Sequence, residues 1–173
     1  VATYPEFDKL REINDSFDFV QGKSEELTTD ARLLDHLRTG IRFSHHDASH
    51  TYRNVSEEIK LLAPYIQPGG LMVIDDFGNP HFMQVVAAVF AFLAQDDCEL
   101  EMGLYAFNKA YIWRKADYPL FAPAVLQNVL PCMKLAGFNL QITRTDRVEK
   151  YRAFSLVAKK QAGDDDYYGL KTY

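Results

Sequence analysis

The chain has 173 residues, of which 47% are hydrophobic and 13% aromatic, a composition typical of a globular domain with one buried core. Its 24 acidic and 19 basic residues leave a net charge of -5 without a dense basic block, so we do not expect nucleic acid as a partner. Cys98 and Cys132 form no paired motif, which argues against a disulfide framework or a thiolate zinc site and favours a cytoplasmic location. The longest apolar run, residues 85–93, is too short to cross a membrane.

The first half of the chain alternates short apolar runs with longer runs at helical spacing, which predicts βαβ units around a parallel sheet. We expect a first strand at residues 17–20 that stops at Gly22. A helix follows, and Gly40 is expected to end it because glycine tolerates the left-handed cap conformation. A second strand is predicted at residues 41–46. The apolar face of the intervening helix consists of Leu27, Ala31, Leu34 and Leu37.

A second helix and a third strand come next. Apolar residues at helical spacing occupy positions 52–62, and Pro64 is expected to end this helix because proline has no amide hydrogen. The Pro-Gly-Gly sequence at 68–70 predicts a turn into a strand at 71–74. That strand is apolar on both faces, as expected where helices cover both sides of a parallel sheet.

The remaining predicted elements are a helix, a strand pair, a second helix and two final strands. Asn79 and Pro80 predict the cap and the first turn of a helix that runs to Leu93. After it we expect a strand pair at 102–115, a helix at 120–136 closed by Gly137, and strands at 138–143 and 151–158.

We interpret residues 1–160 as one α/β domain and residues 161–173 as a solvated acidic tail. The predicted sheet is mostly parallel and flanked by helices, with antiparallel strands at its C-terminal end.

Acidic residues follow the predicted strands at their carboxyl ends, where ligands gather in an open parallel sheet. Asp47 follows the second strand, and Asp75 and Asp76 follow the third. Two adjacent acids at the end of a buried apolar strand are costly to keep ionised without a cation or hydrogen-bond donors. Magnesium or manganese suits such oxygen donors. The alternative is that both acids cap the next turn or face solvent.

His50 lies three residues after Asp47, where strand gives way to helix, so both side chains could face one cleft. A divalent cation acidifies a substrate hydroxyl, and an imidazole that titrates near neutrality can take its proton. The alternative is a helix-start histidine bonded to the backbone. His45 and His46 precede the acid in the strand, where we expect one to point to each face in a structural role.

The segment HHDASHTYRNVSEEIKLLAPYIQPGGLMVIDDF, residues 45–77, resembles a stretch of the class I S-adenosylmethionine-dependent methyltransferases. It is most similar to that of the metal-dependent O-methyltransferases. The resemblance implies a Rossmann-like fold, S-adenosylmethionine as cofactor, and magnesium or manganese bound by Asp47, Asp75 and Asp76. It also implies that His50 is the catalytic base.

The same resemblance places Gly22, Lys23 and Ser24 near the adenine of the cofactor, with Asp47 as a further cofactor-binding residue. The glycine-rich turn and the first two strands of the family have no counterpart, since no GxGxxG sequence opens a helix. We therefore expect the N-terminal strands of the full fold to be missing. A missing N-terminal segment or a second copy would cover the exposed sheet edge.

The function expected from the resemblance is O-methylation of a small hydroxylated metabolite. A hydroxylase-type relative that kept the metal site is a close enzymatic alternative. The alternative from another class is a non-catalytic or truncated methyltransferase-like domain that acts as a binding or oligomerisation module. Neither the acceptor nor the oligomeric state follows from the sequence, because acceptor pockets are built outside the strand-end motif.

Overall fold

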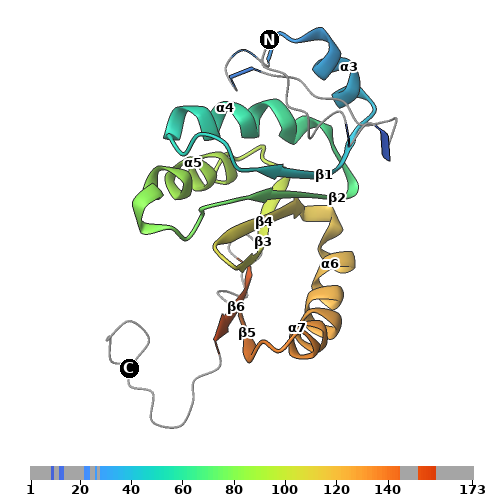
Figure 1. Ribbon diagram of the computed structural model, residues 1–173, viewed down its shortest axis with the longest axis vertical. Helices are drawn as coiled ribbons and strands as arrows, with labels where there is room; N and C mark the ends of the chain where they lie inside the picture. The colour runs from blue at the N-terminus through green and yellow to red at the C-terminus, as the bar shows by residue number, and fades with distance from the viewer. Residues whose placement is uncertain are drawn as a thin grey trace.

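The structure is a computed structural model that describes residues 28–144 and 152–158, together with positions 9, 12, 13, 22, 23 and 26. Its centre is a six-stranded sheet with the strand order β1-β2-β4-β3-β6-β5 (Figure 1). The strands are β1 Ile41–His46, β2 Ile66–Ile74, β3 Leu100–Ala106, β4 Lys109–Arg114, β5 Leu140–Arg144 and β6 Phe154–Ala158.

The sheet is mixed rather than mostly parallel. β1 pairs with β2 and β3 pairs with β6 in parallel, whereas β2/β4, β3/β4 and β5/β6 are antiparallel. The Rossmann-like α/β class and the antiparallel C-terminal strands are therefore confirmed. Within the described residues the parallel pairs are fewer than expected, because the 100–114 hairpin inserts between β2 and the last two strands.

Helix α3, Ala31–Arg38, precedes the first described strand and ends just before Gly40, as predicted. The side chain of Asp30 accepts a hydrogen bond from the backbone N–H of Leu33, which satisfies one of the free donors at the start of a helix. Gly40 has φ +89°, the left-handed conformation expected of it. The turn therefore leads directly into β1 at Ile41.

Helix α4, Tyr52–Leu62, connects β1 to β2, and Pro64 lies in the short 3-10 turn that follows it, as predicted. The strand β2 begins earlier than expected, at Ile66. Ile41 pairs with Ile66 but Phe43 pairs with Leu71, so the Pro-Gly-Gly segment forms a wide irregularity within the strand. The predicted turn is thus a bulge inside β2.

One face of the sheet is covered by α4 and by α5, Met83–Leu93 (Figure 1). The side chain of Asn79 caps the 3-10 turn that precedes α5, as the Asn-Pro pair predicts. The apolar core between these helices and the sheet includes Val55, Ile59, Met72, Ile74, Val85, Val89 and Ile112.

The helix predicted at 120–136 is divided into α6, Tyr118–Ala124, a π-helical turn, Val125–Val129, and α7, Leu130–Leu135. Pro123 and Pro131 lack amide hydrogens, so one regular helical ladder cannot run through the segment. Gly137 follows with φ +86°. Side chains from this segment pack with Leu104, Trp113 and Phe154 on the second face of the sheet.

The predicted strand at 17–20 and the acidic tail at 161–173 lie outside the described residues, and the division at residue 160 stays a prediction. Within 28–144 and 152–158, no helix combines the length and apolar character needed to cross a membrane.

We expect Gly103→Ala to destabilise the protein, because a Cβ at this position would lie 1.6 Å from the Trp113 ring. Overpacking of this kind costs about 1–3 kcal/mol of unfolding free energy. Urea unfolding measures the change. Gly137→Asn is the control, since that position has open space and asparagine tolerates a positive φ. Equal stability of Gly103→Ala and wild type would contradict the packing described.

Candidate metal and base site

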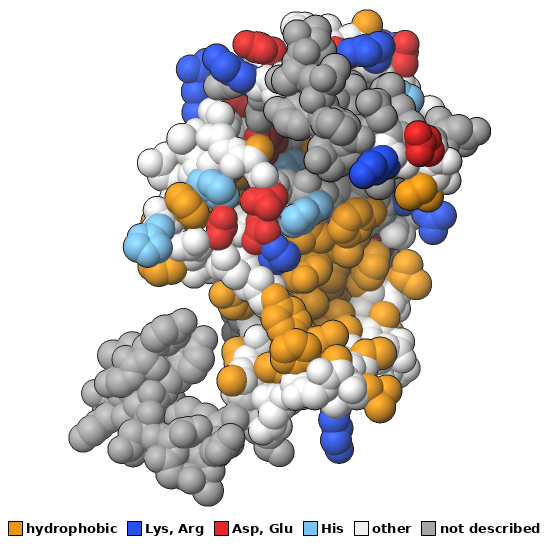
Figure 2. Space-filling view, in the orientation of Figure 1, with side chains coloured by type: hydrophobic (Ala, Val, Ile, Leu, Met, Phe, Trp, Pro, Cys, Tyr) orange, Lys and Arg blue, Asp and Glu red, His pale blue; other side chains and the backbone are white. Residues whose placement is uncertain are grey.

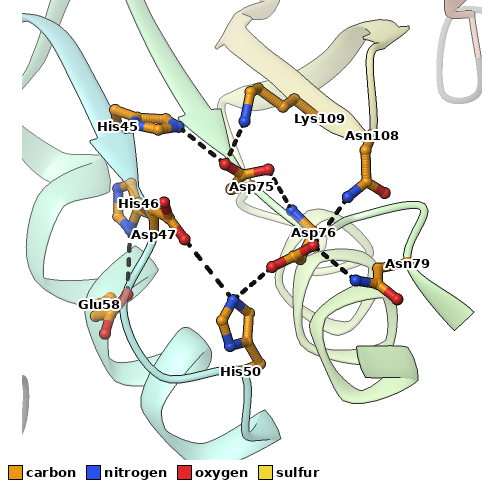
Figure 3. Close-up of polar contacts among 10 residues, drawn as sticks. All are labelled: His45, His46, Asp47, His50, Glu58, Asp75, Asp76, Asn79, Asn108 and Lys109. Atoms are coloured by element: carbon orange, nitrogen blue, oxygen red, sulfur yellow. Dashed lines mark hydrogen bonds and ion pairs between the residues drawn. The ribbon is translucent and has the colours of Figure 1, made fainter. Parts of the chain in front are cut away.

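Asp47 follows β1, and Asp75 and Asp76 follow β2. These acids lie side by side because β1 and β2 are parallel neighbours that end at the same edge of the sheet. His46 and Ile74 are register partners at the ends of the two strands. Beyond them, the backbone N–H of Asp75 donates a hydrogen bond of 2.9 Å to the carbonyl of His46. Asp47 and the Asp75-Asp76 pair therefore leave the sheet together, as predicted from the strand ends (Figure 3).

Asp47, His50 and Asp76 form one cluster at this edge. The Nε2 atom of His50 lies 2.7 Å from Oδ2 of Asp76 and 3.9 Å from Oδ1 of Asp47. One ligand atom from each residue lies within 4.8 Å of the others. The side chains of His50 and Asp76 are 24% and 19% exposed, whereas that of Asp47 is 55% exposed. The cluster is thus enclosed on the Asp76 side and open beside Asp47.

His50 is held by its neighbours in a fixed plane. It precedes Thr51, the N-cap of α4, and its ring stacks on Phe82 with centroids 4.1 Å apart. Its Nε2 is buried and has no hydrogen-bond partner among the described residues, although it lies at ion-pair distance from Oδ2 of Asp76. Buried ring nitrogens usually have a polar partner, and here the carboxylates of Asp76 and Asp47 face the atom.

Asp76 is held in a conformation that few non-glycine residues adopt, with φ +55°. Its Oδ1 atom accepts hydrogen bonds from Nδ2 of Asn79 and Nδ2 of Asn108, each at 2.9 Å. The other oxygen is left to face His50 (Figure 3). Such backbone outliers concentrate at functional sites, where surrounding contacts hold them in place.

Sequence reasoning missed both asparagines as members of the site. Asn79 was predicted only as a helix cap, a role that it does fill through its Oδ1 atom. Asn108 lies in the tight turn between β3 and β4, where a positive φ favours asparagine. That signal could have located the turn, but nothing local to it indicates that the turn lies against the end of β2.

Asp75 faces a different set of partners from Asp76. Its Oδ2 atom contacts the ammonium of Lys109 and lies 3.5 Å from Nε2 of His45, while Oδ1 accepts the backbone N–H of Asp76. Burial raises the pKa of Asp75, but hydrogen bonds from Lys109 and Asp76 and the nearby positive charge outweigh it, so the pKa is lowered overall. Asp75 is therefore an ionised partner of Lys109.

The two histidines of β1 point to opposite faces, as predicted (Figure 3). His46 is 8% exposed, and its Nδ1 lies 3.4 Å from Oε2 of Glu58 in α4. His45 points toward Asp75 on the other face. Both therefore border the cluster without belonging to it.

Of the predicted cofactor-binding residues, Gly22 and Lys23 are described and both are exposed. Ser24 lies outside the described residues. Their assignment to the cofactor stays a prediction, as does the second role given to Asp47.

The donor set of the cluster fits a divalent cation. The separations of 2.7 Å and 3.9 Å both run from Nε2 of His50 to the carboxylates of Asp76 and Asp47, which would be the ligands. Two carboxylates and water suit magnesium or manganese, whereas a coordinating imidazole would shift the preference toward zinc or iron.

Comparisons with known proteins relate the chain to methyltransferases. Residues 3–77 match the family model described as a methyltransferase domain, a range that contains Asp47, His50, Asp75 and Asp76. No curated protein matches.

Among solved structures, the chain is similar to the apo structure of CalS11, a TDP-rhamnose 3'-O-methyltransferase of calicheamicin biosynthesis. The two are 20% identical with a TM-score of 0.41, over 53% of this chain and 38% of that one. The chain thus spans well under half of that protein's length.

We expect Lys109→Met to lower the unfolding free energy by about 1–3 kcal/mol, because it leaves the partly buried Asp75 carboxylate without its main partner. The double variant Lys109→Met/Asp75→Asn is expected to recover much of this loss, since it removes both charges. Urea unfolding at neutral pH measures both. A single variant as stable as wild type would show that the ion pair is not a significant contact.

Proposed function

We propose that this chain belongs to the class I S-adenosylmethionine-dependent methyltransferases. In this proposal it carries the metal-binding residues and the catalytic base of an O-methyltransferase for a small hydroxylated metabolite. In this proposal Asp47 and Asp76 hold a divalent cation, magnesium or manganese, and His50 is the catalytic base. The observation that carries the proposal is the buried Nε2 of His50, which faces both carboxylates without a hydrogen-bond partner among the described residues.

Each residue of the cluster has a distinct task in this reaction. A divalent cation between the two carboxylates would lower the pKa of the acceptor hydroxyl. His50 takes the hydroxyl proton on Nε2, and the nearby Asp76 carboxylate stabilises the imidazolium that forms. Stacking on Phe82 keeps the imidazole plane aimed at the cluster while it does so.

Methyl transfer itself depends mainly on alignment. S-adenosylmethionine, when bound, would supply the methyl group to the acceptor oxygen and would leave as S-adenosylhomocysteine. The acceptor proton remains on His50 until solvent removes it beside the exposed Asp47. Figure 2 shows acidic and histidine side chains gathered above a hollowed apolar surface, which would suit an acceptor with an apolar part.

Asp75 has a different place in the proposal from the one that its sequence position implied. Its two oxygens already serve Lys109, His45 and the backbone of Asp76. It could bind a cation directly only by giving up Lys109. We therefore propose that Asp75 is not a ligand of the cation. Its ion pair with Lys109 instead sets the local charge beside Asp76.

Metal titration separates the three acids. We expect Asp76→Asn and Asp47→Asn to weaken Mn²⁺ binding strongly, because each removes an anionic ligand, and Asp75→Asn to have a much smaller effect. Calorimetry on the full chain gives the affinities, and thermal melting checks that each variant is folded. Loss of binding in Asp75→Asn with retention in Asp76→Asn would reverse the assignment.

His50→Gln tests the base. A general base contributes about 10²–10⁴-fold to the rate, so methyl transfer should fall by that order while Mn²⁺ affinity is retained. The assay compares the variant with wild type in the longest active form of the protein, with and without chelator. If His50→Gln loses Mn²⁺ as well, the residue is a ligand. Full activity in chelator would contradict the metal-assisted mechanism.

A binding module is the second candidate function, and one observation favours it. Phe43 is 64% exposed on β1, which is the edge strand among the described residues. Apolar side chains on an open sheet edge invite another chain. Titration with S-adenosylhomocysteine separates the two functions, since tight binding requires a cofactor site and a pure binding module has none.

A further inference from the structure

We propose that Asn79 and Asn108 are positioning residues that aim the Asp76 carboxylate at His50, and that the turn between β3 and β4 is therefore part of the site. Their effect on a metal rests on the proposed function. Their effect on the orientation of Asp76 does not, because it follows from contacts within the chain.

The two carboxylate oxygens of Asp76 have different contacts. Oδ1 accepts two hydrogen bonds, and Oδ2 faces His50. A carboxylate only accepts hydrogen bonds, so the amide atoms that face Oδ1 are the Nδ2 groups of Asn79 and Asn108. With both donors on Oδ1, the plane of the carboxylate is fixed and Oδ2 points at Nε2 of His50. Asp76 is thus preorganised to offer one oxygen to the cluster.

The backbone of the turn between β3 and β4 also contacts the residues that follow β2. Ala106 and Lys109 are register partners, so Phe107 and Asn108 form a two-residue turn with φ +51° and +67°. This geometry is that of the preferred hairpin turns, in which asparagine is common. The carbonyl of Asn108 accepts a hydrogen bond of 2.9 Å from the N–H of Phe77. Asn108 therefore binds two consecutive residues after β2.

Gly78 allows this close approach. A Cβ at Gly78 would lie 2.0 Å from the hydroxyl of Tyr105 and 3.1 Å from Oδ1 of Asn108. The turn and the segment 76–79 are consequently fitted to one another without room for a side chain. A fit of this kind keeps the two amides in place while Asp76 stays at its positive φ.

The chemistry of the donors explains why the adjacent acids differ. Asp75 is paired with the positive charge of Lys109, which largely cancels its charge. Asp76 instead receives hydrogen bonds from neutral amides on Oδ1, which orient it, while Oδ2 faces His50. One hairpin therefore pairs one acid with a lysine and helps to orient the other through an amide hydrogen bond.

Two substitutions remove the donors while sparing the backbone. Asn108→Gly keeps a residue that accepts a positive φ, and Asn79→Ser keeps an N-cap acceptor for the turn before α5. Phe107→Gly is the matched control, since it changes the same turn at a position that does not contact Asp76. Thermal melting checks that all variants are folded.

Two measurements on the full chain test the inference. The proton–nitrogen correlation spectrum of the histidine rings, recorded without metal, should show a shifted Nε2 signal of His50 in Asn108→Gly but not in Phe107→Gly. Mn²⁺ affinity should fall by about 10- to 100-fold, as for other residues that orient a ligand, and further in the double variant Asn79→Ser/Asn108→Gly.

The outcomes distinguish the inference from the function on which it builds. An unchanged His50 signal with unchanged Mn²⁺ affinity in the double variant would overturn the positioning role and leave the metal site intact. A shifted signal in a protein whose wild type binds no Mn²⁺ would support the positioning role and overturn the metal proposal.

Discussion

The parallel pairing of β1 with β2 is the constraint on which the site depends. It places His46 beside Ile74 and makes the chain leave the sheet twice at one edge, so that acids far apart in sequence become neighbours. The bulge at the Pro-Gly-Gly segment absorbs the extra residues of β2 and restores the register before the strand ends. Without that register, Asp47 and Asp76 would not meet across His50.

Much of this arrangement could be predicted from the sequence because it is local. The strand at 41–46, the helix α4 and the acids after each strand follow from periodicity, caps and the rule that ligands gather at strand ends. The division of labour between Asp75 and Asp76 could not be predicted. It depends on a backbone conformation at Asp76 and on a hairpin thirty-odd residues away, whose side chains Asn108 and Lys109 carry no local sign of their targets.

The order of the strands in the sheet also could not be predicted from local sequence. The strand pair at 102–115 was predicted, but its insertion between β2 and β6 depends on packing between distant segments. The helix at 120–136 was predicted as one piece, since its apolar spacing is continuous, and the two prolines divide it. Charges at the site follow this tertiary arrangement: a lysine from the inserted hairpin neutralises one acid, and amides aim the other.

We propose that Asp47 and Asp76, with His50 beside them, form the cation site of a methyltransferase. The most direct test is a crystal structure of the protein soaked with Mn²⁺, in which anomalous scattering locates the ion. We predict one peak between the carboxylates of Asp47 and Asp76, at a coordination distance of about 2.0–2.3 Å from each. A peak on Asp75 away from Asp76, or no peak at this edge of the sheet, would contradict the account.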